Sequence, residues 1–221
     1  MNNSDIEYND YVQPKEQREV LSKMLGLLVT CFENANIEYW IDGGGLLSKC
    51  RNTELFHDDD IDIAVNAKYK TKLYKVLNQF AEQYTEYMVS SDHIGIYKVF
   101  KPNMWLKNPK SGQLFGTPTI DIFLYKQTKS NIIMLDSLNL RKQWPKACHL
   151  STDLYPLQKL EFYSVKCNFP NNFKPYVNAL YPNWENDIIV EVRDIDNDTG
   201  KTTKPHHILF DKHYKFVKML N

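Results

Sequence analysis

The stretch His57-Asp58-Asp59-Asp60-Ile61-Asp62-Ile63-Ala64-Val65 sets acidic residues against branched apolar ones. Side chains on a β-strand alternate between its two faces. Asp60 and Asp62 therefore share one face, and Asp58 joins them if the strand begins that early. Asp59 falls on the other side of the alternation and is left out. The pattern predicts a strand over residues 60–65 with one acidic face and one face packed on a core.

Carboxylates that share one strand face repel each other, so a cation is their natural partner. Oxygen-rich sites of this kind select hard ions such as Mg²⁺ or Mn²⁺. Two such ions roughly 3.5–4 Å apart clamp the attacking and leaving oxygens of phosphoryl transfer. The alternatives are a solvated acidic strand end and a calcium-binding loop. An EF-hand fits poorly, because the glycine and the final glutamate of that loop are missing.

A glycine turn precedes the acids. Residues 37–41 predict a short strand, Gly43, Gly44 and Gly45 interrupt it, and Leu46 begins a helix. Backbone N–H groups in such a turn face an anion, and the positive end of a helix adds to the attraction. A tight turn without a ligand is the alternative. Together the turn and the acids predict a phosphate cradle beside a metal clamp, in which the three glycines bind the substrate.

A third acid lies further along the chain, where Asp121 interrupts the apolar stretch 119–125 that predicts another strand. A buried acid is costly unless it is paired or bound to metal. We expect Asp121 to complete the ion ligation with Asp60 and Asp62 and to act on the acceptor hydroxyl as a general base. The alternatives are a structural acid and exposure on an edge strand. Lys98 and Lys101 are further candidates for a donor phosphate, or solvated surface lysines.

Two stretches carry a family resemblance. Residues 39–51, which contain the glycine turn, and residues 57–63, which contain the acids, resemble the LicD/fukutin family of the nucleotidyltransferase superfamily. Near the C-terminus, residues 181–184 resemble that family's closing aromatic pattern more weakly. The resemblance covers roughly residues 15–185. It implies transfer of phosphocholine, ribitol phosphate or a similar group from a CDP-linked donor to a glycan or glycoconjugate acceptor.

The resemblance also assigns site residues. It maps Asp58, Asp60 and Asp62 onto the acidic site of the family and Arg51 onto its arginine. Arg51 either holds a phosphate through a bidentate fork or forms a structural salt bridge with a nearby acid.

Four positions depart from the family pattern. Gly45 stands for threonine, Ser48 for glycine, His57 for tryptophan and Pro182 for glycine. These departures affect the choice of donor and acceptor more than the metal site.

The composition bounds the function. The 221 residues carry no net charge, with 27 basic and 27 acidic residues, which disfavours general nucleic-acid binding. No apolar run is long enough for a membrane span and the N-terminus is polar, so we expect a cytoplasmic chain. The four cysteines are scattered, and the zinc candidates lack zinc-finger spacing. Those candidates are Cys148, His149, Cys167, His206 and His207.

These patterns predict an α/β fold of the nucleotidyltransferase type, with a mixed sheet flanked by helices. We expect one domain over residues 1–221, with a core at about 15–185 and a polar C-terminal extension, 186–221, containing a surface loop at 194–204. Three alternatives to a LicD-type phosphotransferase stay open. They are nucleotidyl transfer with pyrophosphate release, a non-catalytic binding or scaffold protein, and a calcium-binding structural protein.

Overall fold

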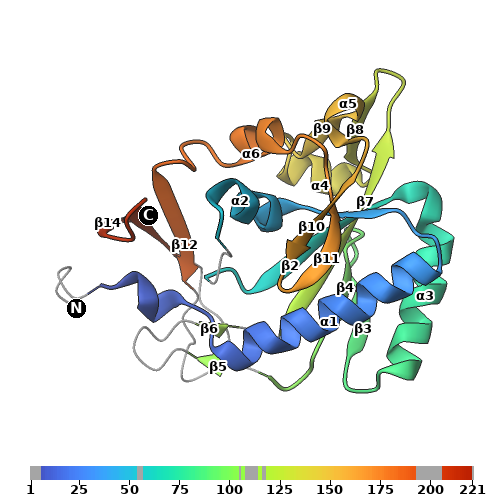
Figure 1. The fold of residues 1–221 in the computed structure, drawn as a ribbon, viewed down its shortest axis with the longest axis horizontal. Helices are drawn as coiled ribbons and strands as arrows, with labels where there is room; N and C mark the ends of the chain where they lie inside the picture. The colour runs from blue at the N-terminus through green and yellow to red at the C-terminus, as the bar shows by residue number, and fades with distance from the viewer. Residues whose placement is uncertain are drawn as a thin grey trace.

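The computed structural model describes residues 6–53, 57–104, 106–107, 114–115, 118–192 and 206–220 (Figure 1). A mixed sheet lies at the centre, in the order β1-β2-β7-β4-β3, and β8 and β9 extend it from β7. Strands β2 and β7 run parallel, and the other pairs are antiparallel. The strands are β1 (Tyr39–Ile41), β2 (Asp60–Asn66), β3 (Met88–Ser91), β4 (Tyr97–Phe100), β7 (Thr119–Gln127), β8 (Ile132–Leu135) and β9 (Cys148–Leu150).

Helices flank this sheet, so the predicted α/β class is confirmed. Helix α1 packs against α3, whereas α2 packs on β2 and lies beside α6 (Figure 1). The helices are α1 (Lys15–Asn34), α2 (Gly43–Arg51), α3 (Lys70–Gln83), α4 (Leu138–Gln143), α5 (Ser151–Leu154) and α6 (Lys174–Leu180), with 3₁₀ turns η2 (Tyr8–Tyr11) and η3 (Ala67–Tyr69). No helix within the described ranges is both long and apolar enough to cross a bilayer.

The core lies between the sheet and its helices. On β2 the apolar face is closed, because Ile61, Ile63 and Val65 are buried, while Asp60 and Asp62 stay half-buried on the other face. The alternation predicted from the sequence is therefore present in the strand. It directs the two acids away from the core.

Three smaller sheets complete the fold. A hairpin joins β10 (Gln158–Phe162) to β11 (Val165–Phe169), and a short ribbon joins β5 (Leu106–Lys107) to β6 (Leu114–Phe115). The described part of the predicted C-terminal extension is a three-stranded antiparallel sheet of β12 (Asp187–Val192), β13 (His206–Asp211) and β14 (Phe216–Leu220). The loop predicted at 194–204 lies outside the described residues.

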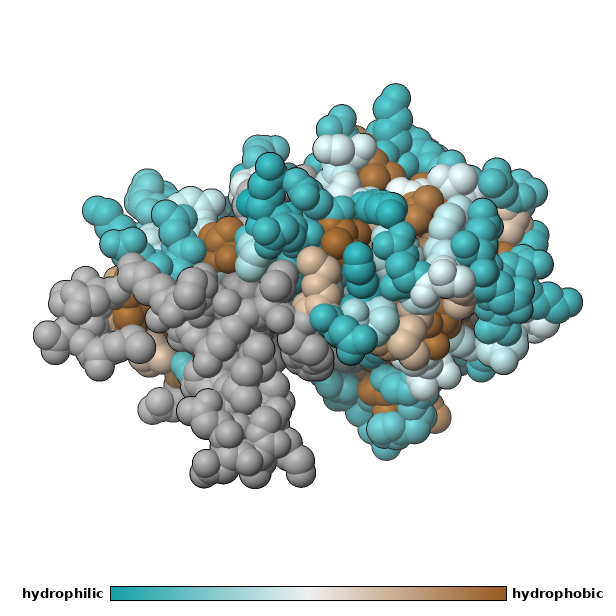
Figure 2. All heavy atoms as spheres, turned by 90° about the horizontal axis from the view of Figure 1, so that it is seen from below, coloured by the Kyte–Doolittle hydropathy of each residue, from teal (hydrophilic) through white to brown (hydrophobic). Residues whose placement is uncertain are grey.

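The C-terminal sheet has a core of its own, formed with the N-terminal segment. Tyr11 packs with Ile188, Val190, Ile208 and Phe210, all of them buried. Every second residue of β12 is apolar and turned to this core, which is the reason this polar stretch forms strands. On the face shown in Figure 2, the described surface is mostly hydrophilic with scattered apolar residues.

Candidate active site

The acids gather where β2 and β7 lie side by side. In the parallel register Asp62 stands opposite Asp121, and Asp60 stands opposite Thr119. Side chains at paired positions of neighbouring strands point to the same face of a sheet. The structure therefore brings Asp121 beside the acidic face of β2, although the two strands are far apart in the sequence.

A second grouping lies at the start of β2. The carboxylates of Asp58, Asp59 and Asp60 offer oxygens that all lie within 4.8 Å of one another, and these residues are half-buried. The strand alternation that excludes Asp59 does not extend to this residue. The strand begins only at Asp60, so the two preceding residues follow a turn and period two does not apply to them.

The triad predicted to bind metal is not drawn together to the same degree. Within the described residues, only Asp58, Asp59 and Asp60 meet that 4.8 Å limit, and Asp60, Asp62 and Asp121 do not. Lys98, opposite Asp121 on β4, donates a hydrogen bond to Asp121 Oδ2. The other oxygen, Oδ1, is buried and has no hydrogen-bond partner within the described ranges. Lys101 instead pairs with Glu86 at 3.5 Å.

Burial and mutual repulsion make these acids resist ionisation. Burial raises the pKa of Asp60 well above its usual range, and neighbouring Asp62 and Asp58 raise it further. Burial, with Asp58 and Asp121 nearby, does the same for the pKa of Asp62. Burial also raises the pKa of Asp121, although Lys98 opposes the shift. Oxygen donors that are crowded and partly desolvated fit a hard divalent cation such as Mg²⁺ or Mn²⁺.

The glycine turn has a different shape from the one predicted. Helix α2 begins at Gly43 rather than at Leu46, so the glycines form its first turn. Gly43 has φ of +50°, and a Cβ there would lie 2.0 Å from Asp62 Oδ2. The bare backbone of Gly43 is thus what lets the Asp62 carboxylate approach the helix N-terminus.

The other two glycines serve different ends. A Cβ on Gly45 would lie 2.3 Å from Ile41 Cγ2, so this glycine allows helix α2 to pack closely on β1. Gly44 is half-buried and lines a cavity. Of the three glycines, Gly44 is the one best placed for a donor phosphate, and that role remains a prediction.

Among the described residues, Arg51 forms none of the salt bridges proposed as its structural role; it bonds to backbone carbonyls instead. Its Nε and Nη2 donate to the backbone carbonyl of Trp184 at 3.2 and 3.0 Å, and Nη2 also donates to the carbonyl of Asp187 at 2.5 Å. Burial lowers the pKa of the Arg51 guanidinium. The residue therefore fastens the start of the C-terminal sheet to the end of α2. Its role toward a phosphate stays a prediction.

His57, which stands where the family has tryptophan, is also held in place. Its Nδ1 lies 2.6 Å from the hydroxyl of Tyr8 in the N-terminal segment. Burial, with Arg51 nearby, lowers the pKa of His57 to about 4. The ring is therefore neutral at neutral pH, and it joins the N-terminal segment to the acid run.

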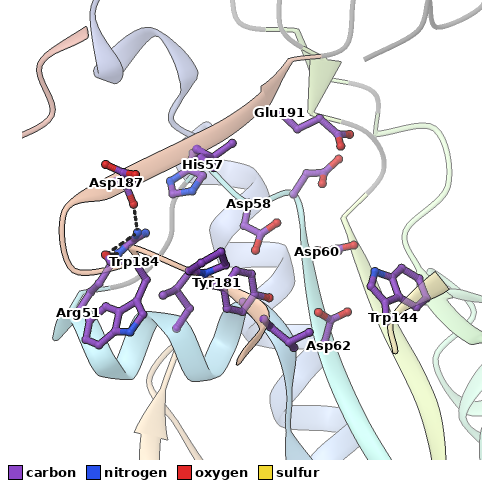
Figure 3. Close-up of a pocket in the computed structure, with 16 residues that line it drawn as sticks. Arg51, His57, Asp58, Asp60, Asp62, Trp144, Tyr181, Trp184, Asp187 and Glu191 are labelled. Atoms are coloured by element: carbon purple, nitrogen blue, oxygen red, sulfur yellow. Dashed lines mark hydrogen bonds between the residues drawn. The ribbon is translucent and has the colours of Figure 1, made fainter. Parts of the chain in front are cut away.

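Two cavities meet at the acids. The larger has a volume of about 500 Å³ and is lined by Gly44, Arg51, Asp58 and Asp59, together with residues of β12. The smaller has about 210 Å³ and is lined by Asp121 and by aromatic residues. Asp60 and Asp62 line both cavities. Figure 3 shows these acids between Arg51 on one side and Trp144 on the other.

Buried polar side chains line part of the smaller cavity, and no motif in the sequence points to them. Asp42 accepts a 2.6 Å hydrogen bond from the hydroxyl of Tyr125, and its Oδ1 lies 3.7 Å from His149 Nε2. The His149 ring stacks on Tyr176 with centroids 4.2 Å apart. His149 thus packs within this cluster, although neither of its ring nitrogens has a hydrogen-bond partner within the described residues. The zinc candidates are dispersed over β9, β11 and β13, and no zinc-like group forms in the described part of the chain.

Comparison with known proteins identifies the class. The profile of the LicD/FKTN/FKRP nucleotidyltransferase domain matches residues 36–172, which include the glycine turn, the acid run and Asp121. The chain belongs to this family. Membership of this family supports a transferase.

Two bacterial proteins are similar in sequence to this chain. An uncharacterized protein of Rickettsia prowazekii (strain Madrid E) is 28% identical over 156 residues, covering 70% of this chain and 51% of the relative. An uncharacterized protein of Rickettsia typhi (strain ATCC VR-144 / Wilmington) is 26% identical over 156 residues, covering 70% of this chain and 43% of the relative. The chain thus spans about half the length of these relatives.

The solved structures that match this chain are more distant in sequence. The lincosamide antibiotic adenylyltransferase LnuA is 14% identical with a TM-score of 0.40, covering 72% of this chain and 81% of that one. The antibiotic-resistance factor ANT(2'')-Ia is 9% identical with a TM-score of 0.42, covering 74% and 75%.

Proposed function

We propose that this chain is a LicD-type phosphotransferase that depends on Mg²⁺ or Mn²⁺. It moves a phospho-alcohol group, such as phosphocholine or ribitol phosphate, from a CDP-linked donor to a hydroxyl of a glycan or glycoconjugate. The observation that carries the proposal is the position of Asp60 and Asp62, which line both cavities and lie beside Asp121. A reaction between two substrates needs its charged centre at such a junction.

Cavity size supports a placement of the two substrates. Sites for drug-sized ligands and cofactors have volumes of about 300–1,000 Å³. The larger cavity, at about 500 Å³, falls in this range, whereas the smaller, at about 210 Å³, is below it. The nucleotide donor therefore occupies the larger cavity, with Gly44 beside its phosphates. The acceptor hydroxyl enters through the smaller cavity, where Asp121 lies.

The acids hold the ions and Asp121 handles the proton. Asp60, Asp62 and Asp121 are the ligands we assign, with Asp58 beside them. When bound, Mg²⁺ or Mn²⁺ neutralises phosphoryl charge and polarises the phosphoryl group. Asp121 Oδ1 is buried and unpartnered within the described residues, so it is ready to accept a hydrogen bond from the acceptor hydroxyl. Its raised pKa favours proton uptake, and Lys98 keeps the carboxylate oriented.

Calorimetry tests the proposal. We expect CDP to bind in the presence of Mn²⁺ and to lose most of its affinity in excess EDTA. Asp60→Asn should weaken Mn²⁺-dependent binding, whereas Glu82→Gln, an exposed acid on α3, should not. Binding that is indifferent to EDTA would contradict a metal-bridged donor.

Product analysis separates the two enzymatic alternatives. Incubation with a CDP-linked alcohol should release CMP. Release of pyrophosphate from CTP would instead identify nucleotidyl transfer, because the same acids serve whichever phosphorus lies between the ions. Stabilisation by Ca²⁺ with no effect of any nucleotide would favour the calcium-binding structural protein.

A further inference from the structure

The C-terminal sheet forms one wall of the larger cavity. Strand β12 alternates along its length, and Ile188, which is buried, faces the second core. Asp187, Ile189 and Glu191 point to the opposite face, and all three line the larger cavity. Figure 3 shows this strand crossing over the acid run, with Asp187 next to Arg51 and Glu191 at the far end.

This wall is fixed in position and lies outside the family match. Arg51 donates to the carbonyls of Trp184 and Asp187, which anchors the beginning of β12 to helix α2. The family profile ends at residue 172, so the wall is not among the positions it covers. A fixed strand in this position adds contacts for a ligand in the larger cavity and leaves the acids within the family match unchanged.

The chemistry of the wall suits the nucleoside part of a nucleotide and not its phosphates. Glu191 lies beside His207 of β13, with Oε2 3.6 Å from His207 Nε2. Asp187 and Glu191 repel phosphate groups, but carboxylates accept hydrogen bonds from ribose hydroxyls and from exocyclic amino groups of bases. Between them lies Ile189, a large apolar side chain that is 49% exposed. An exposed apolar residue inside a pocket gains by covering the flat face of a base.

We infer that β12 is the nucleoside-binding wall of the donor site, with Ile189 packing on the base and Glu191 accepting from its exocyclic amino group. This inference rests on the proposed function, since it places the nucleotide in the larger cavity. It makes Ile189 and Glu191 specificity-determining residues. It also favours a base that carries an amino group, such as cytosine, over one that lacks it, such as uracil.

The experiment measures affinity for CDP and UDP by calorimetry with Mn²⁺, using the whole chain. Ile189→Ala should weaken CDP binding by about tenfold through lost apolar contact, and Ile189→Leu should retain most of it. Val217→Ala is the matched control. Val217 is 50% exposed on the same sheet and lines neither cavity, so its truncation should leave affinity unchanged. Glu191→Gln should bring the CDP and UDP affinities closer together.

The outcomes separate this inference from the proposed function. If the wild type binds CDP and both Ile189→Ala and Val217→Ala bind it with the same affinity, β12 does not contact the nucleoside. That result would refute the inference and leave the proposed function standing. If Glu191→Gln leaves the ratio of CDP affinity to UDP affinity unchanged, Glu191 does not accept a hydrogen bond from the amino group of the base. Failure of the wild type to bind any nucleotide with Mn²⁺ would overturn the proposed function itself, and the inference with it.

Discussion

The close approach of Asp62 to Gly43 makes a sharp prediction for Gly43→Ala. The added Cβ would lie 2.0 Å from Asp62 Oδ2, too near for any real contact, and it would lie in a residue with φ of +50°. A left-handed backbone at alanine costs about 1–2 kcal/mol, and moving Asp62 off its rotamer costs about 0.5–1.5 kcal/mol. The variant should therefore lose about 1.5–3.5 kcal/mol of unfolding free energy.

The measurement is urea denaturation in EDTA, followed by Mn²⁺ titration. Because the displaced carboxylate is one of the ligands we assign, Mn²⁺ affinity should fall by about 10–100-fold, as it does when groups that position a ligand are removed. Gly26→Ala is the matched control. Its Cβ would lie 3.6 Å from Val165 Cγ2, an ordinary contact on helix α1, so stability should rise by up to about 1 kcal/mol.

A double-mutant cycle identifies the source of the loss. In the Asp62→Ala background the clashing oxygen is gone, so Gly43→Ala should cost only the backbone contribution of about 1–2 kcal/mol. The coupling between the two sites should then be about 1 kcal/mol. An equal cost of Gly43→Ala in both backgrounds would refute the reasoning, because the strain would not involve Asp62.

Three further predictions concern charge. Asp121→Asn should lower turnover by roughly two orders of magnitude or more and retain the affinity for the donor. A lower melting temperature with normal turnover would instead show that Asp121 has a structural role. His57 has its pKa lowered to about 4, so its share of stability is complete above pH 6.5 and declines as the pH falls toward 4. The change in unfolding free energy between pH 4 and pH 7, measured by denaturation, should be smaller by about 1–3 kcal/mol in His57→Gln. The same pH profile in the variant and the wild type would contradict a lowered pKa of His57. The raised pKa values of Asp60 and Asp62 mean that ionisation destabilises the metal-free fold as the pH rises above about 3.8, so the melting-temperature gain from Mn²⁺ should be larger at pH 8 than at pH 5.

Local sequence patterns predict the two acidic strands at the centre of the candidate site. The period-two alternation in residues 60–65 fixes which face of β2 is acidic, and the apolar stretch around Asp121 marks a strand of the same sheet. Such patterns depend only on neighbours in the chain, so they can be read without the fold. The family resemblance then supplies the pairing of strands that places Asp121 near Asp62.

Contacts between residues far apart in the sequence account for the features that the sequence does not predict. Arg51 is bound to carbonyls more than a hundred residues away, and no local signal names such partners. The alternation that excludes Asp59 depends on where β2 begins, and a local pattern does not fix the end of a strand to one residue. The close approach of the Asp62 carboxylate to Gly43 is likewise visible only in three dimensions, while the phosphate role predicted for the glycine turn stays a prediction.

The parallel pairing of β2 with β7 has a consequence for how the chain folds. Parallel neighbours cannot be joined by a tight turn, and here about sixty residues separate Asp62 from its partner Asp121, so closing this loop carries a substantial entropic cost before any contact repays it. Hairpins such as β10–β11 close over short distances and do not face this barrier. We therefore expect the acids to meet late in folding, so a nascent chain on the ribosome would expose the acidic strand β2 well before β7 is available to pair with it.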